Sequence, residues 1–196
     1  MSISRLVTAL AVTALILGPA RLAAQQSDPT GVHLAGALSG AGIVYEGDDE
    51  AESGGGASLR LGWGFNRTVT VFAEAAGARV EMIDFSDTYA LAHFDLGVRL
   101  NFRGPQAKAL PYAVLAVSGR SAGIDLGGDV LTITGAGPTF GGGVAIFFNE
   151  NVALDLGLKW TTGEFTEAEF MGDKDTIDIS ATSARFDVGV SWWAGR

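Results

Sequence analysis

The feature that most constrains this chain is a regular alternation of large apolar residues with small or polar ones. In residues 59–65 every second residue is large and apolar, and the residues between are Gly or Arg. The same scheme recurs in residues 93–102, 152–160 and 184–192. Successive side chains of a β-strand point to opposite faces, so a period of two predicts strands with one apolar face. We therefore expect an all-β chain.

The pattern predicts eight strands joined by alternately short and long connections. The strands are expected at 31–45, 56–66, 68–82, 89–102, 110–120, 134–148, 152–163 and 182–193. Tight turns are expected around Arg67 and Glu150, and a moderately short connection at 103–109. The other connections are predicted to be long, acidic loops at 46–55, 83–88, 121–133 and 164–181. Short turns at one end and longer loops at the other are typical of membrane barrels.

The residues on the second face of each strand decide which side is inside. They are Gly, Ala, Ser, Thr and charged residues, and the chain has 28 glycines. A soluble barrel would fill its core with the large apolar side chains, and it remains the alternative. Small and polar residues suit the interior of an eight-stranded barrel, which is only just wide enough for side chains. We therefore predict an eight-stranded antiparallel up-and-down transmembrane β-barrel with its apolar face toward lipid.

Pairing strands about the centres of the two tight turns predicts a register. Centring the first turn on Arg67 places Arg60 opposite Glu74, both on the inward face. Centring the second on Glu150 gives only outward apolar pairs, Phe140 with Trp160 and Val144 with Leu156. The alternation of both hairpins is therefore consistent with one barrel wall.

The first two dozen residues read as a cleaved signal peptide. Arg5 precedes an uncharged apolar run at 6–17, which Gly18 and Pro19 end. The run is shorter than the ~20 residues of a membrane-spanning helix, which makes an anchor the weaker alternative. We expect cleavage after Ala24, which divides the chain into a signal peptide at 1–24 and a barrel domain at 25–196.

Composition excludes several classes of function. The chain has no cysteine, so no disulfide, zinc-thiolate site or thiol nucleophile is possible. Its formal net charge of −9 is unfavourable for nucleic acid, whose affinity comes largely from Lys and Arg. The Gly-rich runs fall in or before strands and do not open a helix, so no phosphate-binding loop is expected. No cofactor and no dedicated metal site are predicted.

Three sequence features resemble one known family. They are the Phe-Asn-x-Thr/Asn turns at 65–68 and 148–151, the strand centred on Tyr112, and the closing strand at 185–193. The chain resembles the small outer-membrane barrels that include the transmembrane domain of outer membrane protein A. The resemblance implies the outer membrane of a Gram-negative-type bacterium, periplasmic termini, outer-membrane lipids as surroundings, and insertion by the barrel-assembly machinery. Such barrels usually end in an aromatic residue, so Trp192 or Trp193 is the expected insertion signal.

The inward face carries a balanced set of charges. The predicted lumen residues are Arg60, Glu74, Asp95, Arg99, Asp155, Lys159, Arg185 and Asp187, with His93 as a neutral or switchable partner. Isolated charges are costly in a low-dielectric interior, so the balance predicts ion pairs that plug the lumen. The alternative is a narrow ion path gated by one of these pairs, with Arg60–Glu74 as the first candidate.

We expect a non-enzymatic protein with an envelope-structural or surface-interaction role and a largely filled lumen. A narrow pore or small-ligand conduit is the second hypothesis, and a lipid-modifying enzyme is the third. Neither His33 nor His93 has the His-x-Ser spacing of outer-membrane deacylases, and Ser39 shares the face of His33 without a neighbouring acid. The acidic loop segments 46–52 and 173–175 are expected to be solvated, with weak divalent-cation binding as the alternative.

Overall fold

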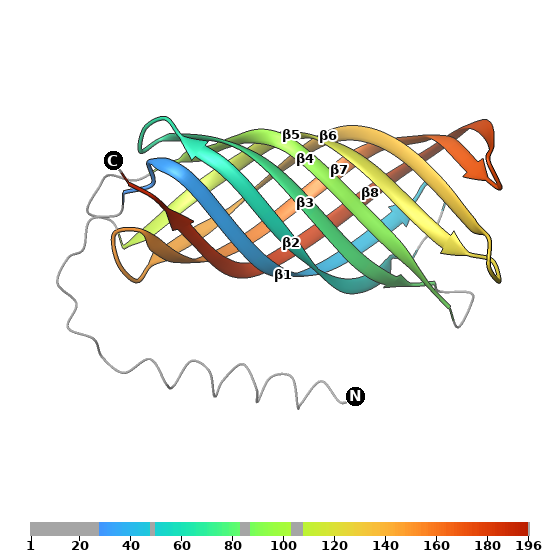
Figure 1. The fold of residues 1–196 in the computed structure, drawn as a ribbon, viewed down its shortest axis with the longest axis horizontal. Coiled ribbons are helices and arrows are strands. Elements are labelled where there is room, and N and C mark those ends of the chain that lie inside the picture. The colour runs from blue at the N-terminus through green and yellow to red at the C-terminus, as the bar shows by residue number, and fades with distance from the viewer. Residues whose placement is uncertain (1–27, 48–49, 83–86, 103–107, 196) are drawn as a thin grey trace, which may run out of the picture.

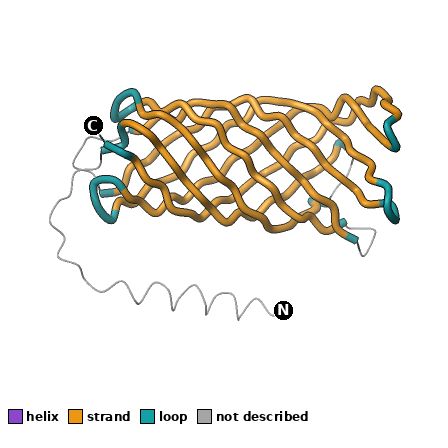
Figure 2. The backbone as a smooth tube through the Cα atoms, viewed as in Figure 1, coloured by secondary structure: helices purple, strands orange, loops and turns teal. Residues whose placement is uncertain are grey.

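Eight antiparallel strands form a closed barrel in the computed structural model, which describes residues 28–47, 50–82, 87–102 and 108–195 (Figure 1). The strands are β1 (Gly31–Tyr45), β2 (Glu52–Gly64), β3 (Val69–Glu81), β4 (Thr88–Asn101), β5 (Ala109–Asp125), β6 (Val130–Phe147), β7 (Val152–Phe170) and β8 (Asp173–Trp193). Strands make up almost all of the described tube (Figure 2). The predicted signal peptide lies outside the described residues. No helix in the described part is long and apolar enough to cross a membrane.

Each strand pairs with the next in the chain, and β1 pairs with β8 to close the ring. The up-and-down order predicted from the sequence is therefore confirmed. So is the register: Arg60 lies opposite Glu74 across β2 and β3. Across β6 and β7, Phe140 pairs with Trp160 and Val144 with Leu156. The first of these pairs is a stacked aromatic contact with ring centroids 6.0 Å apart.

The two tight turns have the same construction. The Oδ1 atom of Asn66 accepts hydrogen bonds from the backbone N–H groups of Thr68 and Val69, at 2.8 and 2.9 Å. Asn149 accepts from Asn151 and Val152 in the same way, at 2.9 and 2.8 Å. Asn side chains commonly stabilise turns by bonding to the backbone two residues on. The repeated Phe-Asn motif is therefore a turn signature, and both turns lie at the end where the described part of the chain begins and ends (Figure 1).

The opposite end of the barrel corrects the sequence prediction. Long loops were predicted at 121–133 and 164–181, but most of these residues are strand. Only residues 126–129 connect β5 to β6. Met171 and Gly172, both at positive φ, connect β7 to β8. In place of loops, two long hairpins project from the barrel on the right of Figure 1.

The error has a physical cause. A tilted strand needs about 9–11 residues to cross the hydrocarbon layer. β7 has 19 residues and β8 has 21, so both continue well beyond it. Where a strand has left the membrane its outer face meets water, and beyond the outer end of the lumen its inner face does too, so the apolar alternation that marks it in the sequence is lost. Polar strand was therefore mistaken for loop.

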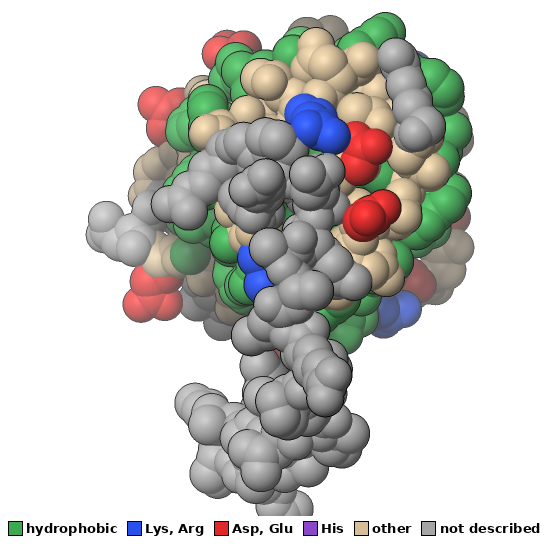
Figure 3. Space-filling view, turned by 90° about the vertical axis from the view of Figure 1, so that its left-hand side faces the viewer, with side chains coloured by type: hydrophobic (Ala, Val, Ile, Leu, Met, Phe, Trp, Pro, Cys, Tyr) green, Lys and Arg blue, Asp and Glu red, His purple; other side chains and the backbone are tan. Residues whose placement is uncertain are grey.

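Large apolar side chains cover the outer wall, as expected for a surface that faces lipid. Exposed aromatic residues cluster where even-numbered strands end, at the end of the barrel that has the two tight turns: Trp63, Phe65, Phe102, Phe148 and Trp192. Figure 3 shows hydrophobic side chains around the periphery of this end of the barrel. Such girdles lie at the membrane–water interfaces of outer-membrane barrels.

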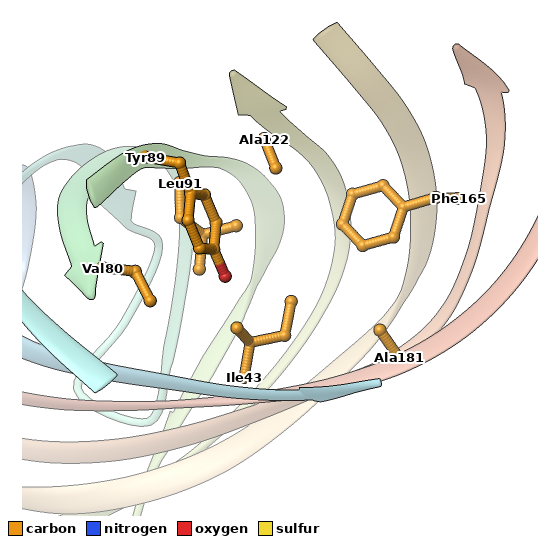
Figure 4. Packing of buried hydrophobic residues seen from close by; sticks show 7 residues of the cluster. All are labelled: Ile43, Val80, Tyr89, Leu91, Ala122, Phe165 and Ala181. Carbon is orange, nitrogen blue, oxygen red and sulfur yellow. The ribbon is translucent and has the colours of Figure 1, made fainter. Parts of the chain in front are cut away.

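The interior has three layers along the barrel axis, and the buried ion pairs lie in the middle layer. An outer cluster of buried apolar side chains comprises Ile43, Val80, Tyr89, Leu91, Ala122, Phe165 and Ala181, which point toward one another in Figure 4. A second cluster near the termini comprises Leu110, Ala145, Phe147, Ala153 and Trp193. The expectation of a small and polar inner face therefore holds for the middle layer and fails at both ends.

Candidate functional site

The middle layer of the lumen brings together all nine predicted lumen residues. Each lies on the inward face of its strand and is at most 8% exposed: Arg60, Glu74, His93, Asp95, Arg99, Asp155, Lys159, Arg185 and Asp187. The alternation places them there because every second residue of a closed barrel faces the axis. They come from β2, β3, β4, β7 and β8, so the layer joins most of the wall.

Glu74 is the centre of the larger network. Its Oε2 atom accepts from Nε of Arg60 at 2.7 Å and lies 2.5 Å from Nη2 of the same guanidinium. Its Oε1 atom accepts from Nζ of Lys159 and lies 3.5 Å from Nη1 of Arg185. Three cations from three strands therefore share one carboxylate. Of the described acids, Glu74 is the only one in salt-bridge contact with Arg60.

The network continues to two further carboxylates. Lys159 Nζ lies 2.9 Å from Oδ2 of Asp187, whose Oδ1 accepts from the Ser39 hydroxyl at 2.5 Å. Arg185 Nη2 donates to Oδ2 of Asp95 at 2.6 Å. Lys159 and Arg185 thus each have a second acid. The chain of contacts crosses the lumen from β2 to β8 and back to β4, which holds opposite walls of the barrel together.

A second network lies around Asp155. Arg99 Nη1 donates to its Oδ2 at 2.6 Å, and the Tyr112 hydroxyl donates to its Oδ1. The Arg99 guanidinium carbon also lies 3.6 Å from the centroid of the Tyr112 ring, and its Nε donates to Asn101 at 3.0 Å. Tyr112 was expected only as a feature of the family resemblance. Its even number, which it shares with the other inward residues of β5, indicates that its side chain points into the lumen.

One buried cation, Arg120, was not among the predicted lumen residues. It is 3% exposed on the inward face of β5. Its Nη1 donates to the carbonyl of Ala181 at 3.0 Å, and its guanidinium carbon lies 4.8 Å from the ring centroid of Phe165. The strand predicted at 110–120 ends with this residue and alternates less clearly than most of the others, so Arg120 was not assigned to the lumen. Its even number, shared with the other inward residues of β5, would have placed it inside.

The histidines do not form a recognisable catalytic arrangement in the described chain. His33 stacks on Trp193 with centroids 4.3 Å apart, and neither of its ring nitrogens has a hydrogen-bond partner there. Ser39 bonds to Asp187 and has no contact with His33. His93 Nε2 lies 3.0 Å from Oγ of Ser183, a distance suited to a base and nucleophile. Both side chains are buried in the lumen, however, where no substrate could reach them without opening the barrel.

The two candidate insertion residues differ in orientation. Trp192 faces outward and is 40% exposed, whereas Trp193 is fully buried between His33 and Phe147. The alternation of β8 requires this, because adjacent residues point to opposite faces.

One small cavity borders the charge network. A cavity of about 10 Å³ lies beside Arg60, Glu74 and Asp155. This volume is close to the minimum of about 10–15 Å³ that a single water molecule needs.

Outward apolar side chains, inward ion pairs, an aromatic girdle and tight turns at one end are features of an outer-membrane barrel. The family model for the outer membrane protein beta-barrel domain matches residues 8–192. The chain belongs to this family. It is an eight-stranded antiparallel transmembrane barrel, and the family places it in the outer membrane of Gram-negative bacteria. No curated protein matches the chain.

Solved structures of similar fold support the same architecture. Neisserial surface protein A aligns with a TM-score of 0.66 and 17% identity, over 83% of this chain and 97% of that one. OprG from Pseudomonas aeruginosa gives 0.59 and 12%, over 86% and 98%. Ail, the attachment invasion locus protein of Yersinia pestis, gives 0.54 and 13%, over 83% and 99%. At these identities the likeness shows the fold alone.

Proposed function

We propose that this chain is a non-enzymatic outer-membrane barrel whose lumen is closed, and that it acts through its outer hairpins or as a structural element of the envelope. The observation that carries the proposal is the charge layer, in which every buried carboxylate of the described lumen has a cation within 4 Å. Paired charges that fill the cross-section leave no continuous water path.

The two apolar clusters support closure independently of the charges. An ion crossing the lumen would have to pass the outer cluster around Phe165 and the inner one around Trp193. Most side chains of both layers are apolar and cannot replace its hydration shell, and an unpaired charge in such surroundings is costly. The barrier therefore has three parts in series: apolar, charged and apolar.

Both described ends of the chain lie beside the tight turns (Figure 1), at the end with the aromatic girdle. Because outer-membrane barrels have short turns on the periplasmic side, we propose that both termini are periplasmic. The long hairpins then project from the cell. In this arrangement Trp192 faces lipid at the inner interface, where the barrel-assembly machinery could recognise it.

The projecting hairpins suggest what kind of partner the surface could meet. They are rich in carboxylates: Asp125, Asp129, Glu164, Glu167, Glu169, Asp173, Asp175 and Asp178. At the tip of the β7–β8 hairpin, Met171 is 72% exposed. Acidic strands with an apolar tip favour a basic partner with an apolar patch. Ail has been solved in complex with a heparin analogue, but this rim should repel such a sulfated sugar.

Divalent cations are a weaker proposal for the same surface. The described residues contain no cluster of three or more His, Cys, Asp or Glu side chains arranged to hold a metal ion. We therefore expect only diffuse binding, in which cations bridge the acidic hairpins to phosphorylated lipid headgroups. Calorimetry with Ca²⁺ should give no saturating site below millimolar concentration, and a saturating one would contradict this.

The second candidate is a narrow pore or small-ligand conduit, and the charged lumen favours it. Glu74 alone connects three cations, so a shift of one side chain would loosen the layer. A solute-efflux assay on sealed liposomes distinguishes the two candidates. A closed barrel should release neither entrapped K⁺ nor a small neutral sugar faster than liposomes containing a denatured control. Fast release by the wild type would support the conduit and overturn the closed-lumen proposal.

A further inference from the structure

A groove runs along β3 on the outer wall of the barrel. Between Val71 and Arg79 the outward residues of this strand are all small: Ala73, Ala75 and Gly77. The strands on either side carry large outward side chains that are more than half exposed, Leu59 and Leu61 on β2, and Phe94 and Leu96 on β4. Two overlapping hollows of about 780 and 640 Å³ lie here, and both are lined by Leu59, Ala75 and Phe94. The wall is therefore concave at β3, between two apolar ridges.

Packing within the barrel does not require this groove. A Cβ atom added to Gly77 would meet nothing within 4 Å beyond its chain neighbours. By contrast, a Cβ added to Gly56, an inward residue of β2, would strike the backbone of β3 at Gly77 and Ala78. The inward glycine permits the close approach of two strands. The outward one leaves open a surface that only a molecule outside the barrel can fill.

A cation lies at the outer end of the groove. Arg79 is the next outward residue of β3 after Gly77, and it is exposed. Its cross-strand neighbours are Gly55 and Ala90, and neither has a side chain larger than a methyl group. No salt bridge among the described residues includes Arg79, although Glu81 lies two residues farther out on the same face. The guanidinium is therefore available to an anion from outside the barrel.

We propose that this groove binds a phosphorylated lipid of the outer leaflet. Arg79 donates to the lipid phosphate, whose oxygens suit the fork of a guanidinium. One acyl chain lies along Ala73, Ala75 and Gly77 between the two ridges. The strand from Ala73 to Gly77 spans about 13 Å, close to half of the ~30 Å hydrocarbon layer and so to the depth of one leaflet. The inference rests on the proposed orientation, because Arg79 lies at the outer interface only if the tight turns are periplasmic.

The same features disfavour a second copy of the chain in this groove. A two-fold dimer brings the same surface patch of both subunits together. With the axis along the membrane normal, two concave grooves would face each other and leave the space between them unfilled. The two Arg79 side chains would also approach each other at one level of the membrane, where like charges repel. A lipid supplies both the missing apolar volume and the missing negative charge.

Native mass spectrometry of the refolded mature protein in neutral detergent, titrated with lipid A, tests the headgroup contact. The comparison ligand is the same lipid A after removal of its phosphates. Wild type should bind the phosphorylated form at least about tenfold more tightly, the factor expected for one hydrogen bond to a charged group. Arg79→Gln should bind both forms alike, whereas Arg67→Gln, which removes an exposed arginine at the other end of the barrel, should keep the difference. A wild type that does not distinguish the two forms would overturn the site, and this comparison needs no variant.

Filling the groove tests the acyl chain separately. Gly77→Leu occupies the open space on β3 and should lose most of the binding of both forms of lipid A. The matched control is Gly119→Leu on β5, an exposed wall glycine where an added Cβ also meets nothing within 4 Å but which lines neither hollow. It should bind as wild type does, and heat-dependent gel mobility verifies that both variants fold. Equal binding by Gly77→Leu and Gly119→Leu would contradict the proposal, as would a wild-type dimer that Gly77→Leu abolishes.

The orientation and the closed lumen are tested apart from the lipid site. Lipid binding in detergent does not depend on whether the barrel conducts. Protease added to whole cells should cut the projecting β7–β8 hairpin if it faces outward. Protection of this hairpin would overturn the orientation and, with it, the assignment of the lipid to the outer leaflet.

Discussion

Replacing Glu74 by glutamine removes the carboxylate that three lumen cations share, while keeping the side chain's size. Lys159 and Arg185 retain Asp187 and Asp95 as partners, but Arg60 loses its only described acid. Removing one partner of a buried ion pair costs about 3–5 kcal/mol, because the other charge is left uncompensated. We therefore expect Glu74→Gln to lower the free energy of unfolding by about 3–5 kcal/mol.

Urea unfolding in lipid vesicles, followed by the heat-dependent shift in gel mobility, measures this loss. The matched control is Glu167→Gln in the outer hairpin, where the pair with Lys174 is exposed and contributes little to stability. In the double variant Arg60→Met/Glu74→Gln the stranded cation is gone, so the loss should be smaller than the sum of the two single losses. If Glu74→Gln destabilised the barrel no more than Glu167→Gln does, the charge layer would not be the structural centre of the lumen.

Three further predictions follow from single contacts. Phe165→Ala should cost about 3–5 kcal/mol in unfolding free energy by leaving a cavity in the outer apolar cluster, and Phe170→Ala, on the exposed hairpin, should cost much less; equal losses would contradict the outer cluster. Trp192→Ala should slow assembly into membranes with little loss of stability, whereas Trp193→Ala should assemble normally but destabilise the folded barrel by about 3–5 kcal/mol. The reverse pattern would contradict the assignment of Trp192 as the insertion signal and Trp193 as a core residue. The hydrogen bond and charge of Glu167 raise the pKa of Lys174 above its ordinary value of 10.5. The small stabilisation from this pair should therefore be complete below pH 10.5 and disappear as the pH rises through the raised pKa. An NMR titration that gave an ordinary pKa for Lys174 would contradict this prediction.

The membrane-embedded part of the fold was predictable because lipid on one side and a narrow lumen on the other impose opposite demands on adjacent residues. That constraint predicts the strand order, the two turns and the Arg60–Glu74 pairing from the sequence alone. Where the constraint ends, the prediction failed. Apart from the buried Phe165, residues 164–170 and 173–180 are at least partly exposed to water, and little in their polarity distinguishes them from loop.

The candidate site was predictable as a set of residues and not as a set of contacts. Alternation assigned Glu74 and Asp155 to the lumen, but it says nothing of which cation each one meets across the barrel. Glu74 is joined to Lys159 from β7 and Arg185 from β8, and these contacts depend on strand tilt and barrel diameter. Arg120 was lost for a simpler reason, since the predicted strand ended where its side chain turns inward.

Single-channel recording of the refolded mature protein in a planar bilayer tests the closed lumen most directly, with insertion verified by heat-dependent gel mobility. The account predicts a silent bilayer for the wild type at moderate voltage. It also predicts that Phe165→Ala and Glu74→Gln, which weaken two of the three layers, each remain silent alone. Only the double variant should begin to pass current. Stable and reproducible current steps from the wild type would contradict the closed lumen and make the ion pairs of Glu74 the first candidates for a gate.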